Sequence, residues 1–195
     1  MLELSPKAKI YIFANKIDKL LDNQKNPVFS KIKEIFEKVE IKDNSKAIYL
    51  PTSIFDISLY KAMSNIYSDL IPKMDKIKEL LKKLVTASWA DEAVLLEKNT
   101  LIKICSFNEK EFKDYERFEK ISELIKKFKN TCRLGSISFK DIFIKTINNI
   151  IYIDEFENST YIIIAFQNLK TTLELVKINI EFIFIIWLFD IQLIF

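Results

Sequence analysis

The sequence predicts an α/β layer followed by an α+β domain built on a five-stranded antiparallel sheet. Residues 8–71 alternate twice between a short strand-like run and a helical pattern, which is typical of parallel α/β structure. After Pro72 the order changes to helix, two strands, helix, three strands and helix, which favours an antiparallel sheet with helices packed on it. We therefore expect domains at 1–72 and 73–182, followed by an apolar tail at 183–195.

The first domain consists of two strand-to-helix steps. Residues 8–14 form a β-branched and aromatic run, and Asn26 followed by Pro27 is typical of a helix start. A second apolar run at 47–50 leads to a polar stretch, after which Asp56 is expected to cap another helix. Two parallel strands do not close a sheet of this class, so this domain is expected to be incomplete.

The second domain is expected to follow a regular order of elements. Its helices carry apolar residues at helical spacing, and its strands are rich in β-branched and aromatic residues. Lys98 and Asn99 are expected to form a tight hairpin turn between the first two strands. The predicted segments are a helix at 74–85, strands at 92–97 and 100–107, a helix at 112–128, strands at 137–146, 150–156 and 161–167, and a helix at 171–182.

Composition excludes several function classes. The chain has 30 Lys and Arg against 27 Asp and Glu, and these charges are interspersed, which argues against a nucleic-acid groove. It has no histidine, the most frequent general base and metal ligand. Cys105 and Cys132 lack the spacing of a metal site and are typical of reduced thiols in a cytosolic protein. We therefore expect no metal site, and no secretory signal at the start of the chain.

Glycine is the most informative residue type, because Gly135 is the only one in the chain. A phosphate-binding loop of the GxxxxGK(S/T) type requires two glycines, and a GxGxxG dinucleotide fingerprint requires three. A bare backbone at these positions lets N–H groups approach the phosphates. The 195 residues contain neither motif, so we expect no catalytic residue for phosphoryl transfer in this chain.

Residues 15–18 match the NKxD pattern that recognises guanine. The carboxylate of Asp18 could accept hydrogen bonds from two N–H donors on the guanine edge, a pairing that adenine does not offer. The stem of Lys16 could cover the flat base while its ammonium group stays in water. The amide of Asn15 could meet the ring nitrogen and join neighbouring loops. An ordinary polar loop after a strand is the alternative interpretation.

A second loop favours the guanine interpretation. It follows the next strand and contains Ser53 and Ile54. In guanine-nucleotide folds such a loop offers a backbone N–H to the guanine carbonyl, and small residues permit the close approach. Because parallel strands end at the same edge of a sheet, the two loops are expected to meet. The predicted nucleotide-binding residues are Asn15, Lys16, Asp18, Ser53 and Ile54.

Three segments carry a resemblance to one family of small GTPases. They are PTSIFDISLYKAMSNIYSDLIP at 51–72, ADEAVLLEKNTLIKI at 90–104 and YERFEKISELIKKFKNTC at 115–132. These segments resemble Rag/Gtr GTPases, especially the Rag A/B branch, and the resemblance covers about residues 8–180. It implies a partial P-loop-type G domain, consisting of its last two strand-helix units, followed by a roadblock- or longin-like dimerisation domain.

The resemblance also implies ligands and partners. It implies GTP and GDP, held here at the guanine end only, and Mg²⁺ for the intact protein, whose Mg²⁺ ligands have no counterpart in this chain. It implies pairing with a Rag C/D-type GTPase, and recruitment of the TOR kinase complex at a lysosomal or vacuolar scaffold during amino-acid signalling. The implied location is the cytoplasm and that membrane surface. Many members of this branch have histidine where this chain has Asn15, the more general choice in GTPases.

Three interpretations follow from these patterns. The first is a Rag A/B-like GTPase subunit whose phosphate loop and switch segments are expected in frame upstream. The second is a non-catalytic roadblock-type dimerisation scaffold without nucleotide chemistry. The third is a decayed product, because the sheet edge at 8–50 would stay unpaired. The aromatic stripe at 112–128 is interpreted mainly as packing onto the sheet, with a partner-facing surface as the alternative.

The run at 182–195 departs from the polar C-terminal helix of the resembled family. It is nearly all apolar, but at 14 residues with Asp190 inside it is too short to span a membrane, which takes about 20. It also lacks the charged face of a membrane-surface anchor. We expect no transmembrane segment, and we favour a mispredicted gene end or an aggregation-prone strand over an anchor.

Overall fold

The computed structural model divides the chain into two compact units, 1–66 and 67–195. The division falls within a helix, a few residues before the expected boundary at Pro72, and the predicted domain limits stay a prediction. The described residues are 8–38, 47–109, 117–135, 140–147, 149–157, 159–167 and 172–190. The parts of the predicted segments at 112–116, 137–139 and 171 lie outside them.

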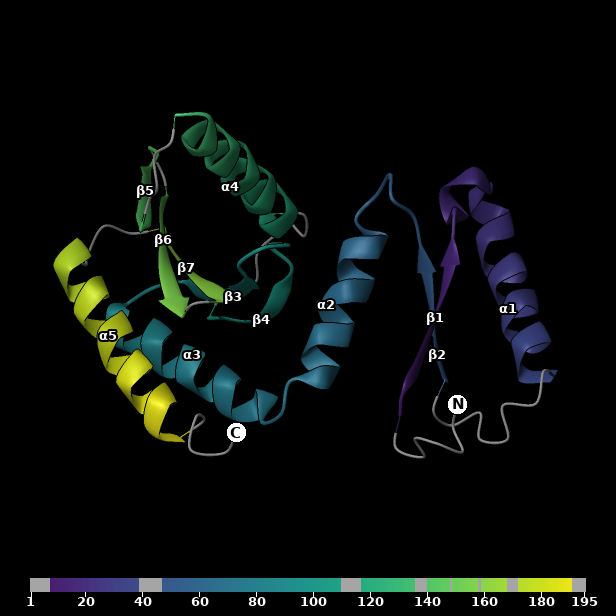
Figure 1. Cartoon of the computed structure of the whole chain (residues 1–195), viewed down its shortest axis with the longest axis horizontal. Coiled ribbons are helices and arrows are strands. Elements are labelled where there is room, and N and C mark those ends of the chain that lie inside the picture. The colour runs from purple at the N-terminus through teal and green to yellow at the C-terminus, as the bar shows by residue number, and fades with distance from the viewer. Residues whose placement is uncertain are drawn as a thin grey trace. The chain divides into compact units, whose positions relative to one another are not determined.

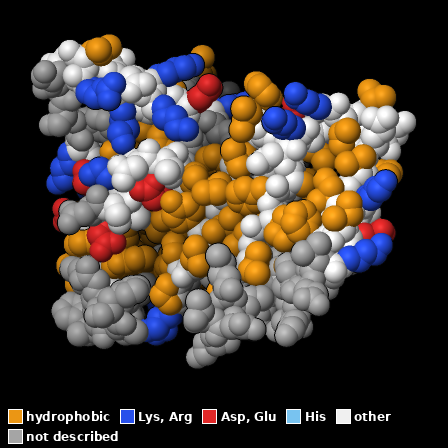
Figure 2. Space-filling model, turned by 45° about the vertical axis from the view of Figure 1, so that its right-hand side comes forward, with side chains coloured by type: hydrophobic (Ala, Val, Ile, Leu, Met, Phe, Trp, Pro, Cys, Tyr) orange, Lys and Arg blue, Asp and Glu red, His pale blue; other side chains and the backbone are white. Residues whose placement is uncertain are grey.

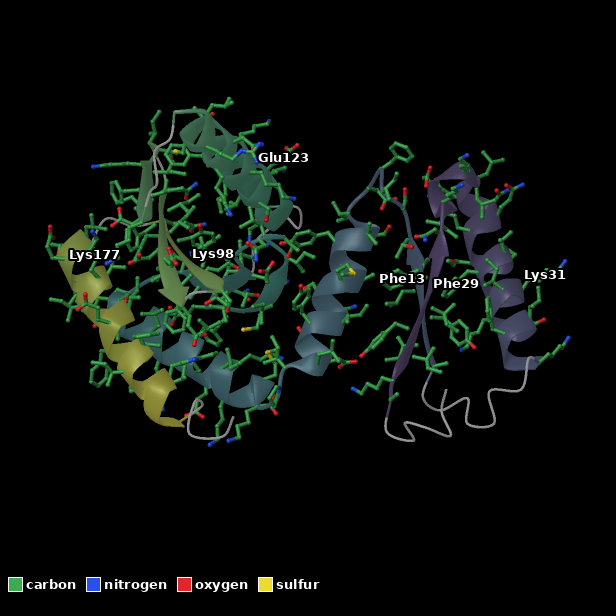
Figure 3. The ribbon with its side chains drawn as sticks, in the orientation of Figure 1. Phe13, Phe29, Lys31, Lys98, Glu123 and Lys177 are labelled. Carbon is green, nitrogen blue, oxygen red and sulfur yellow. The ribbon has the colours of Figure 1, made fainter. Side chains whose placement is uncertain are left out.

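The first unit contains a two-stranded parallel sheet, as the alternating pattern predicts. Its elements are β1 (Ile10–Asn15), the 3-10 helix η1 (Ile17–Lys19), α1 (Asp22–Lys38), β2 (Ala47–Thr52) and the start of α2 (Ser58–Leu70). Helices α1 and α2 lie on opposite sides of this sheet (Figure 1). Phe29 extends from α1 toward the sheet and Lys31 extends away from it (Figure 3), so α1 is amphipathic.

Helix α1 begins earlier than the sequence predicts. It starts at Asp22, so the expected N-cap at Asn26 is wrong. The Gln24 side chain accepts the backbone N–H of Leu21 at 3.3 Å and closes the first turn. The Asp22 carboxylate also lies at the positive end of the helix dipole. Pro27 is then inside the helix, where it removes one backbone hydrogen bond of the second turn.

The start of helix α2 agrees with the prediction. The Asp56 carboxylate accepts the backbone N–H of Ser58 at 2.8 Å, and Ser58 is the first residue of the helix. This hydrogen bond satisfies one of the N–H groups that have no partner within the first turn. Asp56 therefore fixes where the loop after β2 ends.

The second unit is a five-stranded antiparallel sheet with helices on both faces, which confirms the predicted α+β class. The strand order across the sheet is β4-β3-β7-β6-β5. Helices α3 and α5 cover one face and α4 covers the other (Figure 1). The elements are α3 (Met74–Ser88), β3 (Glu92–Glu97), β4 (Lys103–Asn108), α4 (Arg117–Leu134), β5 (Asp141–Lys145), β6 (Ile150–Glu157), β7 (Thr160–Phe166) and α5 (Leu173–Asp190).

Alternation along β3 builds two hydrophobic clusters, one on each face of this sheet. Ala93 and Leu95 belong to the cluster under α3 and α5, whereas Val94 and Leu96 belong to the cluster under α4. Burial of each larger aliphatic side chain stabilises the fold by about 1.5–3 kcal/mol. Other hydrophobic side chains are exposed, and side chains of this type are orange in Figure 2.

The connection between β3 and β4 is longer than predicted. The tight turn expected at 98–99 is wrong, because β4 begins only at Lys103. The Glu97 carboxylate accepts both the N–H and the hydroxyl of Thr100, each at 2.6 Å, which ends β3 in a wider loop. Leu101 then adopts a left-handed conformation with φ 57° and places its side chain in the core at 1% exposure.

The apolar tail expected at 183–195 is helical as far as Asp190, so the interpretation of this run as a strand is wrong. Phe184 and Trp187 of α5 each pack edge-on against Phe156, with ring centroids 5.5 Å apart. The inner face of this helical part, with Ile183, Phe184 and Trp187, therefore belongs to the core of the second unit, and residues 191–195 lie outside the described residues. Among the described residues, no helix combines the length and the hydrophobicity that crossing a membrane requires.

Candidate functional site

Two polar loops meet at the edge of the parallel sheet where β1 and β2 both end. Asn15 is the last residue of β1 and lies in register with Thr52, the last residue of β2. The Thr52 hydroxyl donates to Asn15 Oδ1 at 2.5 Å, and Thr52 is fully buried. The loop that begins at Lys16 and the loop that begins at Ser53 therefore start side by side.

The first loop turns sharply and leaves its polar side chains in solvent. Lys16 adopts a left-handed conformation with φ 67° and ψ 30°, and its carbonyl accepts the N–H of Lys19 at 3.1 Å. This turn forms η1 and carries Asp18, which is exposed like Lys16. Within the described part of the chain, no ion pair or hydrogen bond engages the Asp18 carboxylate. Asp18 is therefore available as an acceptor for an external donor.

The second loop is held by two serine hydroxyls. Ser53 is buried at 1% exposure, and its N–H donates to Ser58 Oγ at 2.7 Å. The Ser53 hydroxyl in turn accepts the N–H of Phe55 at 3.0 Å. The N–H of Ile54, between these two, makes no hydrogen bond to the described residues. The backbone donor that this loop offers to a ligand is therefore that of Ile54, and its side chain is 75% exposed.

Charged groups surround the two loops. The hydrogen bond from the Ser58 hydroxyl, together with its backbone N–H, holds the pKa of Asp56 below the ordinary value of an aspartate. The hydrogen bond and ion pair with Asp22, at 2.7 Å, raise the pKa of Lys25, and smaller Coulombic contributions come from Asp56 and Asp18. Lys25 therefore lies in the field of carboxylates from both loops, and Asp56 stays ionised near neutral pH.

This arrangement suits a flat ligand that presents two N–H donors beside a carbonyl group. The exposed Asp18 carboxylate can accept both donors, and the Ile54 N–H can donate to the carbonyl oxygen. The arrangement does not suit a metal ion. Among the described residues, no group of three or more Asp, Glu, Cys or His side chains could hold one. These described side chains therefore do not fit the Mg²⁺ that the resemblance implies.

The structure adds residues that the sequence patterns did not single out. Thr52 and Ser58 hold the two loops through their hydroxyl groups, and both hydrogen bonds depend on how the chain folds back on itself. Phe55 is 79% exposed beside the Ile54 amide and offers an aromatic surface to a flat ring. Its place next to a small-residue loop was the only signal in the sequence. The binding roles of Asn15, Lys16, Asp18, Ser53 and Ile54 stay a prediction.

Known proteins resemble this chain over most of its length. The Gtr1/RagA G protein conserved region matches residues 1–125. Ras-related GTP-binding protein B of Rattus norvegicus is 32% identical over 181 residues, which are 93% of this chain and 48% of that protein. GTP-binding protein GTR1 of Saccharomyces cerevisiae is 33% identical over 191 residues, with 91% of this chain and 61% of that protein covered. The chain thus spans about half to three-fifths of these relatives.

A solved structure resembles the chain in fold. MglB of Myxococcus xanthus superposes with a TM-score of 0.51 and 18% sequence identity, covering 58% of this chain and 86% of that one. At this identity the likeness concerns the fold alone. Together with the observed sheet order, it confirms the predicted fold class, in which a roadblock-like five-stranded sheet follows two strand-helix units.

Proposed function

This chain belongs to the Gtr1/RagA family of G proteins, and on that premise we propose that its first unit binds the guanine base of GTP and GDP. Asp18 accepts the two N–H donors of the guanine edge, and the Ile54 N–H donates to the guanine carbonyl. The Lys16 stem lies over the ring. Asn15 meets the ring nitrogen, and buried Ser53 keeps the second loop close to the base.

The strand register carries this proposal. Because Asn15 and Thr52 are register partners and share a 2.5 Å hydrogen bond, the two loops start within one residue of each other at the sheet edge. A single loop with an NKxD pattern would be a weak indication, since short motifs recur by chance. Two loops that present an open carboxylate and an open N–H together match the donors and acceptors of one face of guanine.

A base-specificity swap tests the proposal. Guanine has an amino group at C2 and xanthine has a carbonyl, so Asp18→Asn exchanges an acceptor for a donor at the matching place. We expect the full chain to bind guanosine weakly, on the order of millimolar, because only base contacts are present. Saturation-transfer NMR detects affinities of this size. The parent chain should give signals with guanosine but not adenosine, and Asp18→Asn should prefer xanthosine.

The control is a carboxylate that the proposal leaves without a role in base recognition. Asp22 is exposed, lies in the same segment and pairs with Lys25, so Asp22→Asn should leave the guanosine signal unchanged. Equal signals for guanosine and adenosine with the parent chain would refute a guanine-specific site. A swap caused equally by Asp22→Asn would show that local charge, and not the base edge, decides binding.

We also propose that the second unit pairs with another G protein of the Rag C/D type. Strand β5 lies at the edge of the five-stranded sheet, where one row of backbone groups is unpaired within the described sheet. Apolar side chains lie exposed on α4, which covers one face of this sheet: Leu124 at 45% and Phe128 at 41%. Large apolar side chains of this kind are the usual anchors of a protein interface.

Substitution of these anchors tests the pairing. Leu124→Ser combined with Phe128→Ser should weaken binding of a purified Rag C/D-type GTPase by about tenfold or more, as measured by biolayer interferometry. Trp89→Ser removes an equally large exposed side chain elsewhere in the same unit and should have no effect. Undiminished binding by the double variant would refute this surface. Partner binding without any guanosine binding would instead favour a dimerisation scaffold without nucleotide chemistry.

We finally propose a signalling role for a protein that contains this chain together with a phosphate loop and switch segments. In that form it would hydrolyse GTP and, paired with its Rag C/D-type partner, signal amino-acid sufficiency to the TOR kinase complex at a lysosomal or vacuolar scaffold. Family membership supports this role. Cells lacking the gene should fail to phosphorylate TOR substrates after amino-acid refeeding. An unchanged response would count against the proposal.

A further inference from the structure

Helix α5 has apolar residues on two opposite faces. One face is buried in the core of the second unit and consists of Val176, Ile180 and Ile183, none more than 4% exposed. The other face points to solvent, and we call it the outer stripe. Its members are Leu175 at 43%, Ile178 at 61%, Phe182 at 61% and Ile185 at 49% exposure. A helix that only covered the sheet would need apolar residues on one face.

The spacing of the outer stripe is that of a helix–helix seam. Its members follow one another at intervals of three, four and three residues, so they align along one side of α5. With a rise of about 1.5 Å per residue, the stripe extends over about 15 Å. Apolar knobs at this spacing fit between the side chains of a second helix lying nearly parallel or antiparallel to α5.

One flank of the outer stripe carries acidic side chains, and the other flank contacts helix α3. Glu174 and Glu181 stand two helical turns apart on the same flank, and both are exposed. Lys177, which Figure 3 labels on α5, lies on this flank too, but its ammonium group is held by Asp141 at 2.9 Å. On the opposite flank, Asn179 donates to Ser88 of α3 at 3.1 Å. A helix that packs on the outer stripe therefore meets negative charge on the flank that carries Glu174 and Glu181.

A pocket of about 390 Å³ continues this acidic flank between α5 and β6. Phe156, Ile180 and Phe184 supply apolar walls, and Glu181 and Asp154 supply carboxylates, with Lys140 also at the wall. Asp154 Oδ1 is inaccessible to solvent and accepts no hydrogen bond from the described residues. The exposed carboxylate of Glu181, which also lines the pocket, can pair with a cation that enters. The pocket thus suits a long side chain that ends in a cation.

We propose that the outer stripe binds an amphipathic helix of a partner protein that carries Lys or Arg along one edge. Its apolar residues pack between those of the stripe, its cations face Glu174 and Glu181, and one basic side chain enters the pocket. A second copy of α5 fits less well, because antiparallel pairing would bring Glu174 of one copy against Glu181 of the other. An anionic membrane surface is repelled by the same carboxylates.

A pair of synthetic peptides tests this proposal on the full chain. Both are amphipathic helices of about three heptads with Leu at the seam positions; one carries Lys along its edge and the other Glu. Fluorescence anisotropy should show the Lys peptide binding at least about tenfold more tightly than the Glu peptide. Ile178→Ser combined with Phe182→Ser should weaken the Lys peptide by about tenfold or more. Glu181→Lys should reverse the preference between the two peptides.

The control variant is Ile147→Ser, which removes an apolar side chain 98% exposed outside α5 and should change nothing. Tryptophan fluorescence verifies that each variant is folded, because Trp187 packs against Phe156 beneath the outer stripe. Equal binding of both peptides, or binding that survives the double substitution, overturns the proposal. So does binding of phosphatidylserine vesicles in place of the peptides, or self-association in sedimentation that the double substitution abolishes while no peptide binds.

Discussion

The ion pair between Glu92 and Arg117 leads to the sharpest prediction about the second unit. Glu92 lies on β3 and Arg117 is the first residue of α4. The guanidinium group donates to both carboxylate oxygens, from Nε at 3.0 Å and from Nη2 at 2.6 Å. Only 4% of the Glu92 side chain and 20% of the Arg117 side chain are exposed. Solvent therefore has little access to replace either partner.

The magnitude follows from this burial. Arg117→Met leaves the Glu92 carboxylate buried without its cation, and breaking such a pair typically costs about 3–5 kcal/mol. Removing both charges with Glu92→Met and Arg117→Met leaves an apolar contact of similar volume, which is often neutral or stabilising by about 1–4 kcal/mol relative to the pair. We therefore expect the single substitution to be strongly destabilising and the double substitution to recover most of the loss.

Urea unfolding followed by tryptophan fluorescence measures this prediction. Both tryptophans, Trp89 and Trp187, belong to the second unit, so the signal reports the unit that contains the ion pair. The control is Lys83→Met, which breaks an exposed pair with Glu79 and should change stability by less than about 0.5 kcal/mol. If Arg117→Met costs no more than Lys83→Met, or if the double substitution is no better than the single, the reasoning is refuted.

Two further predictions concern single positions in the same unit. Trp89 is 68% exposed and adopts a left-handed conformation with φ 54° directly after α3. Trp89→Gly should therefore stabilise the second unit by about 0.5–1 kcal/mol, whereas the control Lys83→Gly within the helix should destabilise it by about 1 kcal/mol. The urea midpoint of unfolding, followed by Trp187 fluorescence, measures both changes. Burial raises the pKa of Asp154, against the hydrogen bond from Tyr152, so the folded state binds more protons and stability falls as pH rises above the ordinary aspartate range. Asp154→Asn should therefore be more stable than the parent near pH 7 and lose that advantage in acid below that range, and a constant difference at all pH values would contradict this.

The elements of the fold followed from the sequence wherever apolar periodicity decided them. Strand β3 covers the predicted range, because alternating burial against α3 and α4 requires each of its apolar residues. The errors occur where side chains bind the backbone locally, as Glu97 does with Thr100. In a sequence, a glycine usually indicates a position with a left-handed backbone conformation. In this chain, Lys16, Leu101 and other non-glycine residues adopt that conformation. With a single glycine in the chain, that signal was missing.

The sequence motifs of the candidate site could be predicted, but the hydrogen bonds that hold its two loops in place could not. The pattern at 15–18 and the loop at 53–54 could be placed at one sheet edge because parallel strands share their carboxyl ends. The hydroxyl of Thr52 on Asn15 depends on an in-register pairing across 37 positions, which no local pattern determines. The hydrogen bond from the Ser53 N–H to the Ser58 hydroxyl likewise depends on the loop conformation. Because this bond occupies the Ser53 N–H, the backbone donor left for a ligand is that of Ile54.

The two surfaces proposed on the second unit do not compete for the same place. Helix α4 covers the face of the sheet that holds Val94 and Leu96, whereas α5 covers the face that holds Ala93 and Leu95. A G-protein partner bound along α4 and the edge at β5 would therefore leave the outer stripe of α5 open, because the sheet lies between the two helices. The two proposals together would give this unit one partner surface on each face of its sheet.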